Sequence, residues 1–147
     1  MNRSKASGAD LEKLAALLAA IPYARFLGVT DALMGERATT VLPFSAHLVG
    51  NTQIPALHGG VIGAFMELAA LAELTASQPA GRRARTIDVT VEYLRPARAM
   101  TTFAQADVRK LGRRIANVRV EAWQDDRVSP VAALRGHFLL DSPEGRH

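Results

Sequence analysis

The sequence predicts a single α+β domain in which one long apolar helix packs against a run of antiparallel strands. Residues 59–77 carry mostly apolar side chains, whereas the segments after residue 86 alternate between apolar and polar side chains. A helix that is apolar nearly all round is typical of a buried position, and a period of two indicates strands with one buried face. A chain of 147 residues suffices for one domain with a real core. The economical arrangement is a sheet that curves around the helix.

The N-terminal segment is predicted to form an amphipathic helix over residues 10–20. Four aliphatic side chains recur at helical spacing: Leu11, Leu14, Leu18 and Ile21. The apolar run from Leu14 to Ile21 resembles the core of a signal peptide, but acidic residues stand directly before it and no clear cleavage site follows. Because the run is also too short to span a bilayer, we favour a packed helix and expect a cytoplasmic location.

The remaining elements are predicted in the order strand, strand, helix and four strands. Pro22 ends the first helix, and short strands follow at 28–34 and 36–42. A loop over residues 43–57 leads to the apolar helix at 59–77. Four alternating strands complete the chain, at residues 86–94, 101–110, 115–124 and 131–140. The first of these has apolar side chains on one face, which we expect to be buried: Ile87, Val89, Val91 and Tyr93.

Composition excludes several classes of site. The chain has no cysteine, which excludes disulfides, thiolate metal sites and a cysteine nucleophile, and its 4 histidines show no metal-ligand spacing. The net charge is +4 and aromatic residues make up 5%, without a basic helix or an aromatic stacking motif, so a nucleic-acid partner is not expected.

Arginines cluster in predicted loops, and two interpretations stay open: a solvated surface, or a site for the phosphates of an anionic ligand. The candidates for the second are Arg82, Arg83, Arg113 and Arg114.

One carboxylate stands in an unusual place, in the middle of the apolar helix. An unpaired buried carboxylate is costly, so Glu67 is expected to be paired, protonated or functional. Nine residues upstream, His58 precedes Gly59 and Gly60 at the predicted helix start, where free backbone N–H groups can bind an oxyanion. Oxyanion donors together with a carboxylate indicate acyl chemistry.

The spacing of these groups also predicts an oligomer. Gly60 and Glu67 are seven residues apart, or about 10 Å along a helix. One carbonyl group cannot contact both groups on the same helix. Two antiparallel helices, one from each subunit, would bring each Glu67 beside the glycines of the other chain. We therefore expect a site shared between two subunits of a homodimer.

The segment His58-Gly59-Gly60-Val61-Ile62, with an acid nine positions after the histidine, resembles the hotdog-fold acyl-CoA thioesterases of the phenylacetate-degradation (PaaI) type. The strand end Val91-Glu92-Tyr93-Leu94-Arg95-Pro96-Ala97 and the Lys110-Leu111-Gly112-Arg113 hairpin fit the same family. The resemblance spans roughly Phe26 to Leu140. It implies an N-terminal helical extension at 1–25, a hotdog domain at 26–141 and a flexible tail at 142–147.

The resemblance implies metal-independent hydrolysis of a coenzyme A thioester, with coenzyme A present only as part of the substrate. Glu67 would be the catalytic carboxylate, acting as general base or nucleophile, and Gly59 or Gly60 would supply the oxyanion N–H. The side chain of His58 would orient the thioester or the loop, and an amide from Asn51 or Gln53 would hold the carbonyl or water. The family also implies homodimers with a continuous sheet, or dimers of dimers, and no membrane partner.

Two positions depart from the family pattern. Relatives usually carry the amide side chain six residues before the histidine, where this chain has Thr52 between Asn51 and Gln53. Several relatives with a glutamate have Ser or Thr one helical turn later, where this chain has Leu71. These departures keep open a second hypothesis, a non-catalytic module that binds or senses acyl-CoA. A hydratase would need a nearby Asp–His pair, which is absent here.

Overall fold

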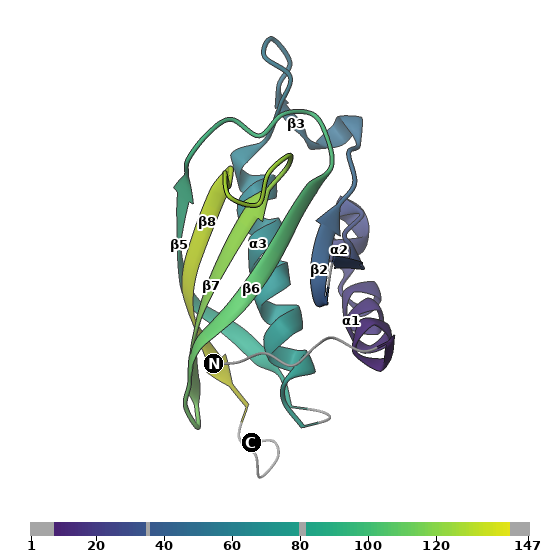
Figure 1. The fold of residues 1–147 in the computed structure, drawn as a ribbon. Helices are drawn as coiled ribbons and strands as arrows, with labels where there is room; N and C mark the ends of the chain where they lie inside the picture. The colour runs from purple at the N-terminus through teal and green to yellow at the C-terminus, as the bar shows by residue number, and fades with distance from the viewer. Residues whose placement is uncertain (1–7, 35, 80–81, 142–147) are drawn as a thin grey trace.

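The computed structural model places one long helix against a curved antiparallel sheet (Figure 1). It describes residues 8–34, 36–79 and 82–141. The sheet has six strands in the order β1-β2-β6-β7-β8-β5. The helices are α1 (Gly8–Ala20), α2 (Pro22–Leu27) and α3 (Gly59–Ala76), with a 3-10 turn, η1, at Ala46–Leu48. The strands are β1 (Thr30–Met34), β2 (Arg37–Leu42), β3 (Val49–Asn51), β4 (Ala56–Leu57), β5 (Ala84–Tyr93), β6 (Thr102–Leu111), β7 (Ile115–Trp123) and β8 (Ala132–Leu140).

This arrangement is the predicted hotdog fold, and its core is the contact between α3 and the sheet. Eight side chains of α3 are buried there: Ile62, Phe65, Met66, Leu68, Ala69, Ala70, Ala72 and Leu74. The helix is also long and apolar enough to cross a bilayer, with a mean hydropathy of 1.4 over 18 residues. The core helix of a globular domain meets the same criterion, and the sheet wraps α3 in this way (Figure 1).

One side of α3 is not fully covered, which corrects the expectation that Glu67 is buried. A stripe of half-buried residues recurs at three- and four-residue spacing along this side: Gly63, Ala64, Glu67, Leu71 and Thr75. Residues at these spacings share one helix face. The sheet and α1 cover the rest of the helix, so this face is the part of the core that a single chain leaves open.

The edge strand β5 borders this open face. The predicted alternation holds for Val89, Val91 and Tyr93, but an irregularity in the pairing between Thr86 and Asp88 interrupts it at Ile87. The expected burial is wrong: Val89 is 37% exposed and Tyr93 is 59% exposed. Val91 and Tyr93 face α3, because a Cβ added at Gly63 would lie 3.7 Å from Val91 Cγ2 and 3.5 Å from the Tyr93 hydroxyl. Nothing in the described chain lies beyond β5, which pairs with β8 on one side only.

The first 57 residues contain elements that the sequence did not predict. Pro22 begins α2 instead of only ending α1, as suits a proline at the first position of a helix. Gly28 ends α2 with φ of 84°, a left-handed conformation that favours glycine. The predicted loop at 43–57 contains η1 and the small β3–β4 hairpin. The predicted tail at 142–147 and the turn residue Gly35 lie outside the described residues.

Candidate active site

His58 organises the start of α3. It is the N-cap residue, and its Nδ1 accepts a hydrogen bond of 2.9 Å from the Gly60 N–H. Its carbonyl oxygen accepts from the N–H groups of Val61 and Ile62, and its own N–H donates to the Leu48 carbonyl oxygen at 2.9 Å. The first two N–H groups of α3 therefore differ. The Gly60 N–H is hydrogen-bonded to the His58 ring, whereas the Gly59 N–H has no partner among the described residues.

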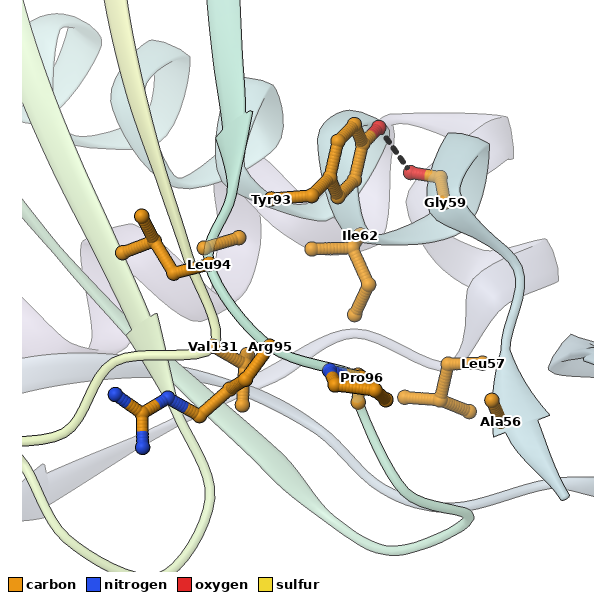
Figure 2. Close-up of a pocket in the computed structure, with 11 residues that line it drawn as sticks. Ala56, Leu57, Gly59, Ile62, Tyr93, Leu94, Arg95, Pro96 and Val131 are labelled. Carbon is orange, nitrogen blue, oxygen red and sulfur yellow. Dashed lines mark hydrogen bonds between the residues drawn. The ribbon is translucent and has the colours of Figure 1, made fainter. Parts of the chain in front are cut away.

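Two glycines lie close to other parts of the chain at the helix start, and at Gly50 the approach leaves no room for a side chain. A Cβ at Gly59 would contact the Tyr93 ring at 3.4 Å, and a Cβ at Gly50 would lie 2.8 Å from the Cα of His58. The Tyr93 hydroxyl donates a hydrogen bond of 2.7 Å to the Gly59 carbonyl oxygen (Figure 2). Tyr93 therefore ties the end of β5 to the first turn of α3, and it holds the backbone that carries the free Gly59 N–H.

A pocket of about 380 Å³ opens beside Gly59. It lies between the start of α3, β4, the end of β5 and the start of β8. Its lining is mostly apolar and includes Ala56, Leu57, Ile62, Leu94, Pro96 and Val131. In Figure 2, Tyr93 and Gly59 lie together on one side of the pocket, and Arg95 lies on the other with its guanidinium directed away from Gly59. The pocket therefore combines a free N–H donor, an apolar wall and a cation at its rim.

Glu67 lies two turns further along α3, on the half-buried face. Its carboxylate makes no hydrogen bond or ion pair with any residue that the structure describes. Covering a carboxylate with apolar groups costs free energy when the carboxylate has no partner. Glu67 is therefore a candidate for a functional role. Within one chain, Glu67 is about 10 Å along the helix from Gly60, as the sequence predicted.

The two candidate amide side chains lie apart from this pocket. Asn51 and Gln53 are exposed on the β3–β4 hairpin, which projects at one end of the molecule (Figure 1). The Asn51 Oδ1 accepts from the N–H groups of Gln53, at 3.0 Å, and Ile54, at 3.4 Å. The side-chain carbonyl of Asn51 thus stabilises a local turn. Neither side chain is among the described residues that line the Gly59 pocket.

The four candidate arginines lie at the other end of α3. Arg82 and Arg83 precede β5, and Arg113 and Arg114 form the β6–β7 turn at the same end of the sheet (Figure 1). The guanidinium of Arg82 donates to the Asp141 carbonyl oxygen at 2.6 Å, to Gln78 Oε1 at 2.8 Å and to the Arg113 carbonyl oxygen. Arg82 therefore joins three segments of the fold. Arg83, Arg113 and Arg114 are exposed.

Comparison with known proteins assigns the fold to a family. The model of the thioesterase superfamily matches residues 55–131, which include all of α3 with Glu67 and three of the six strands of the sheet, β5, β6 and β7. The chain belongs to the thioesterase superfamily. It is 32% identical over 134 residues to the medium/long-chain acyl-CoA thioesterase YigI of Salmonella typhimurium, covering 81% of this chain and 86% of the relative.

Solved structures of other proteins share this thioesterase fold. A protein from Chromobacterium violaceum is 40% identical with a TM-score of 0.72, covering 92% of this chain and 96% of that one. A phenylacetic acid degradation-related protein from Ralstonia eutropha is 22% identical with a TM-score of 0.72, covering 86% and 98% respectively. The predicted resemblance to hotdog thioesterases is thus confirmed.

Two residues around the helix start were not predicted as site residues from the sequence: Gly50 and Tyr93. Tyr93 belongs to the segment that carried the family resemblance, yet it was interpreted only as part of a strand. Arg95 belongs to one of the arginine clusters for which a phosphate site stayed open, but it was not among the four leading candidates. Gly50 gave no local signal, because it lies eight residues before His58 in the sequence. The β3–β4 hairpin brings the two together by pairing Val49 with Leu57.

We predict that Arg82→Ala lowers the free energy of unfolding by about 1.5–3 kcal/mol, the usual range for hydrogen bonds from a charged group. The loss follows from the three acceptors that Arg82 contacts. Urea unfolding at fixed protein concentration measures it. Arg83→Ala is the matched control, because Arg83 is exposed and its side chain has no hydrogen-bond partner in the described chain. Equal stabilities of the two variants would contradict the structural role.

Proposed function

We propose that this protein hydrolyses acyl-CoA thioesters to a free acid and coenzyme A, in a site that two subunits share. The observation that carries the proposal concerns the Gly59 N–H and the Glu67 carboxylate on the open face of α3, neither of which has a partner among residues 8–34, 36–79 and 82–141. The name of the YigI relatives supports an acyl-CoA substrate, and medium or long acyl chains are the class to test first. The expected location is the cytoplasm.

The open face supports a homodimer. β5 is an edge strand with unpaired backbone groups, and its apolar side chains border the stripe of α3 that contains Glu67. Exposed edges and apolar faces of this kind are normally covered. Pairing of β5 with the β5 of a second copy would continue the sheet and cover both α3 helices. A dimer of dimers is compatible with the same interface.

Antiparallel α3 helices would complete the site. If Glu67 of one subunit lies opposite Gly59 of the other, the thioester carbonyl can accept from the Gly59 N–H while the partner's Glu67 faces its carbon. Each dimer then contains two equivalent sites. A single chain cannot reproduce this geometry, because its own Gly59 and Glu67 are about two turns apart on one helix.

The chemistry follows from these two groups. The Gly59 N–H, at the positive end of the α3 dipole, stabilises the negative charge that develops on the thioester oxygen. Glu67 either takes a proton from water as it attacks the carbonyl carbon, or attacks directly to form an anhydride that water then hydrolyses. In both routes, the C–S bond breaks. In the first route Glu67 returns the proton to the leaving sulfur, and in the second coenzyme A leaves as the thiolate and takes a proton from the water that hydrolyses the anhydride. The cap that His58 forms and the hydrogen bond from Tyr93 keep the Gly59 N–H in place.

The arginines at the far end of α3 are candidates for the phosphates of coenzyme A. In the antiparallel dimer, Glu67 of one subunit lies opposite the start of α3 in the other. The rest of its helix, from Glu67 to Ala76, extends about 13 Å beyond that point. Arg83, Arg113 and Arg114 of that subunit would face solvent beyond the thioester. Arg82 is part of the same cluster, although its guanidinium already has three acceptors. Arg95 at the rim of the Gly59 pocket is the alternative cation.

The competing hypothesis is an acyl-CoA binding module without turnover. Leu71 gives it some support, because no hydroxyl stands one turn after Glu67 to position water. Release of free thiol from a panel of acyl-CoA thioesters separates the two hypotheses. Binding of acyl-CoA without thiol release would establish the module and refute the hydrolase.

We predict that Val89→Glu converts the dimer into a monomer with little turnover, because it places a charge in the apolar face that the partner covers. Light scattering and thiol release on the same samples measure both effects. Thr90→Glu is the matched control, since Thr90 pairs with Arg135 on the opposite face of the same strand. A fully active monomer would refute the shared site.

We predict that Glu67→Gln stays folded and dimeric but loses about 10² to 10⁴ in kcat, the range for a general acid–base group. Glutamine keeps the volume of glutamate but cannot accept the proton or attack the carbonyl. Thermal stability should hold or rise slightly, because the charge has no partner to lose. Melting temperature and turnover are measured on one preparation. Near-normal turnover in a destabilised variant would show that Glu67 is a structural residue.

We predict that the double variant Arg113→Glu/Arg114→Glu raises KM far more than it lowers kcat, and that the effect shrinks at high salt. The two positions are exposed at the β6–β7 turn, so the fold should tolerate both changes. Steady-state kinetics at low and high salt test this. Arg95→Glu is measured in parallel, and a KM increase confined to Arg95→Glu would move the phosphate site to the Gly59 pocket.

A further inference from the structure

A second hollow lies between α1 and the C-terminal half of α3. It has a volume of about 330 Å³, within the range of small-molecule sites. Its walls come from three parts of the chain: Leu17 and Ala20 on α1 with Ile21 directly after it, Leu71, Ala72 and Thr75 on α3, and Arg83 directly before β5 with Ala84 at its start. We call this hollow the α1 crevice. It is distinct from the Gly59 pocket, with which it shares no lining residue.

The α1 crevice begins one helical turn from the candidate catalytic carboxylate. Leu71 and Thr75 follow Glu67 at four-residue spacing, so all three lie along one side of α3. The distance along the helix axis is about 6 Å from Glu67 to Leu71 and about 12 Å to Thr75. A chain that leaves a reacting carbon beside Glu67 and follows this stripe therefore enters the crevice directly.

The lining selects an aliphatic occupant. Six of its residues are Leu, Ile or Ala, and the Thr75 hydroxyl already donates to the Leu71 carbonyl oxygen at 2.8 Å. The remaining polar side chain, Arg83, is exposed at the surface. Arg83 is thus the one charged group of a mostly apolar lining. The aliphatic side chains favour apolar surface in proportion to the area removed from water.

We propose that the α1 crevice binds the distal part of the acyl chain, so that α1 determines the longest chain that the enzyme accepts. The inference rests on the proposed thioesterase function and adds a position for the acyl tail. The family model matches residues 55–131, so α1 lies outside the matched region. The preference for acyl chain length would thus be determined by α1, which precedes the region that the family model matches.

The test is a chain-length profile of two crevice variants. Ala20→Trp fills the crevice from an exposed helix position, and Leu17→Ala enlarges it. We measure kcat/KM with butyryl-, octanoyl-, lauroyl- and palmitoyl-CoA. For Ala20→Trp, the ratio of palmitoyl to butyryl activity should fall at least about tenfold, since the loss of even one methylene from a pocket can cost that much. For Leu17→Ala, the same ratio should rise.

The matched control is Ala15→Trp, which adds the same side chain to an exposed position of α1 that does not line the crevice. It should keep the wild-type profile. An equal loss for all chain lengths in Ala20→Trp would place part of coenzyme A in the crevice and overturn the proposal. An unchanged chain-length profile in Ala20→Trp would overturn the proposal as well. If Ala20→Trp fails to fold, an unchanged ratio of palmitoyl to butyryl activity in Leu17→Ala would overturn it. A wild type without turnover on any thioester would instead refute the thioesterase function.

Discussion

The packing of α3 against a curved sheet is the contact on which the rest of the structure depends. The sheet and α1 bury most of the helix, and the apolar side chains of α3 supply a large part of the domain core. Because a single sheet does not close around the helix, one stripe of α3 stays open beside the edge strand β5. The open stripe contains Glu67, so the same packing that stabilises the fold also presents the carboxylate.

The start of α3 depends on short-range contacts of a different kind. His58 caps the helix with its ring, Gly50 lets β3 pass close to that ring, and Tyr93 holds the Gly59 carbonyl from β5. The His58 ring occupies the Gly60 N–H, whereas the Gly59 N–H has no partner in the part of the chain that the structure describes. Under the proposed mechanism, the cap formed by His58 therefore leaves Gly59 as the oxyanion donor.

The two hollows lie near opposite ends of α3, which bears on how the proposed substrate would be divided. The Gly59 pocket has a cation, Arg95, at its rim, whereas the α1 crevice is mostly apolar and follows Glu67 along the helix. With Arg95 as the phosphate site, coenzyme A and the acyl chain would leave the thioester in opposite directions. With Arg113 and Arg114 as the phosphate site, both parts would extend toward the C-terminal end of α3, so the location of the phosphates also decides how the substrate lies.

The sequence by itself determined the order of the main elements, the α+β class and the positions of Glu67 and the glycines, because strong periodicity and glycine spacing are local properties. The hotdog fold was implied by the resemblance to thioesterases. The predicted strands differ from the observed ones by only a few residues, as β7 at Ile115–Trp123 illustrates. The open face of α3, the hydrogen bond from Tyr93 to the Gly59 carbonyl oxygen and the contacts of Arg82 with Arg113 and Asp141 were decided by the tertiary structure. Burial and hydrogen bonding at these places depend on β5, β3 and the C-terminal strand, which approach from distant parts of the chain. No local pattern contains that information.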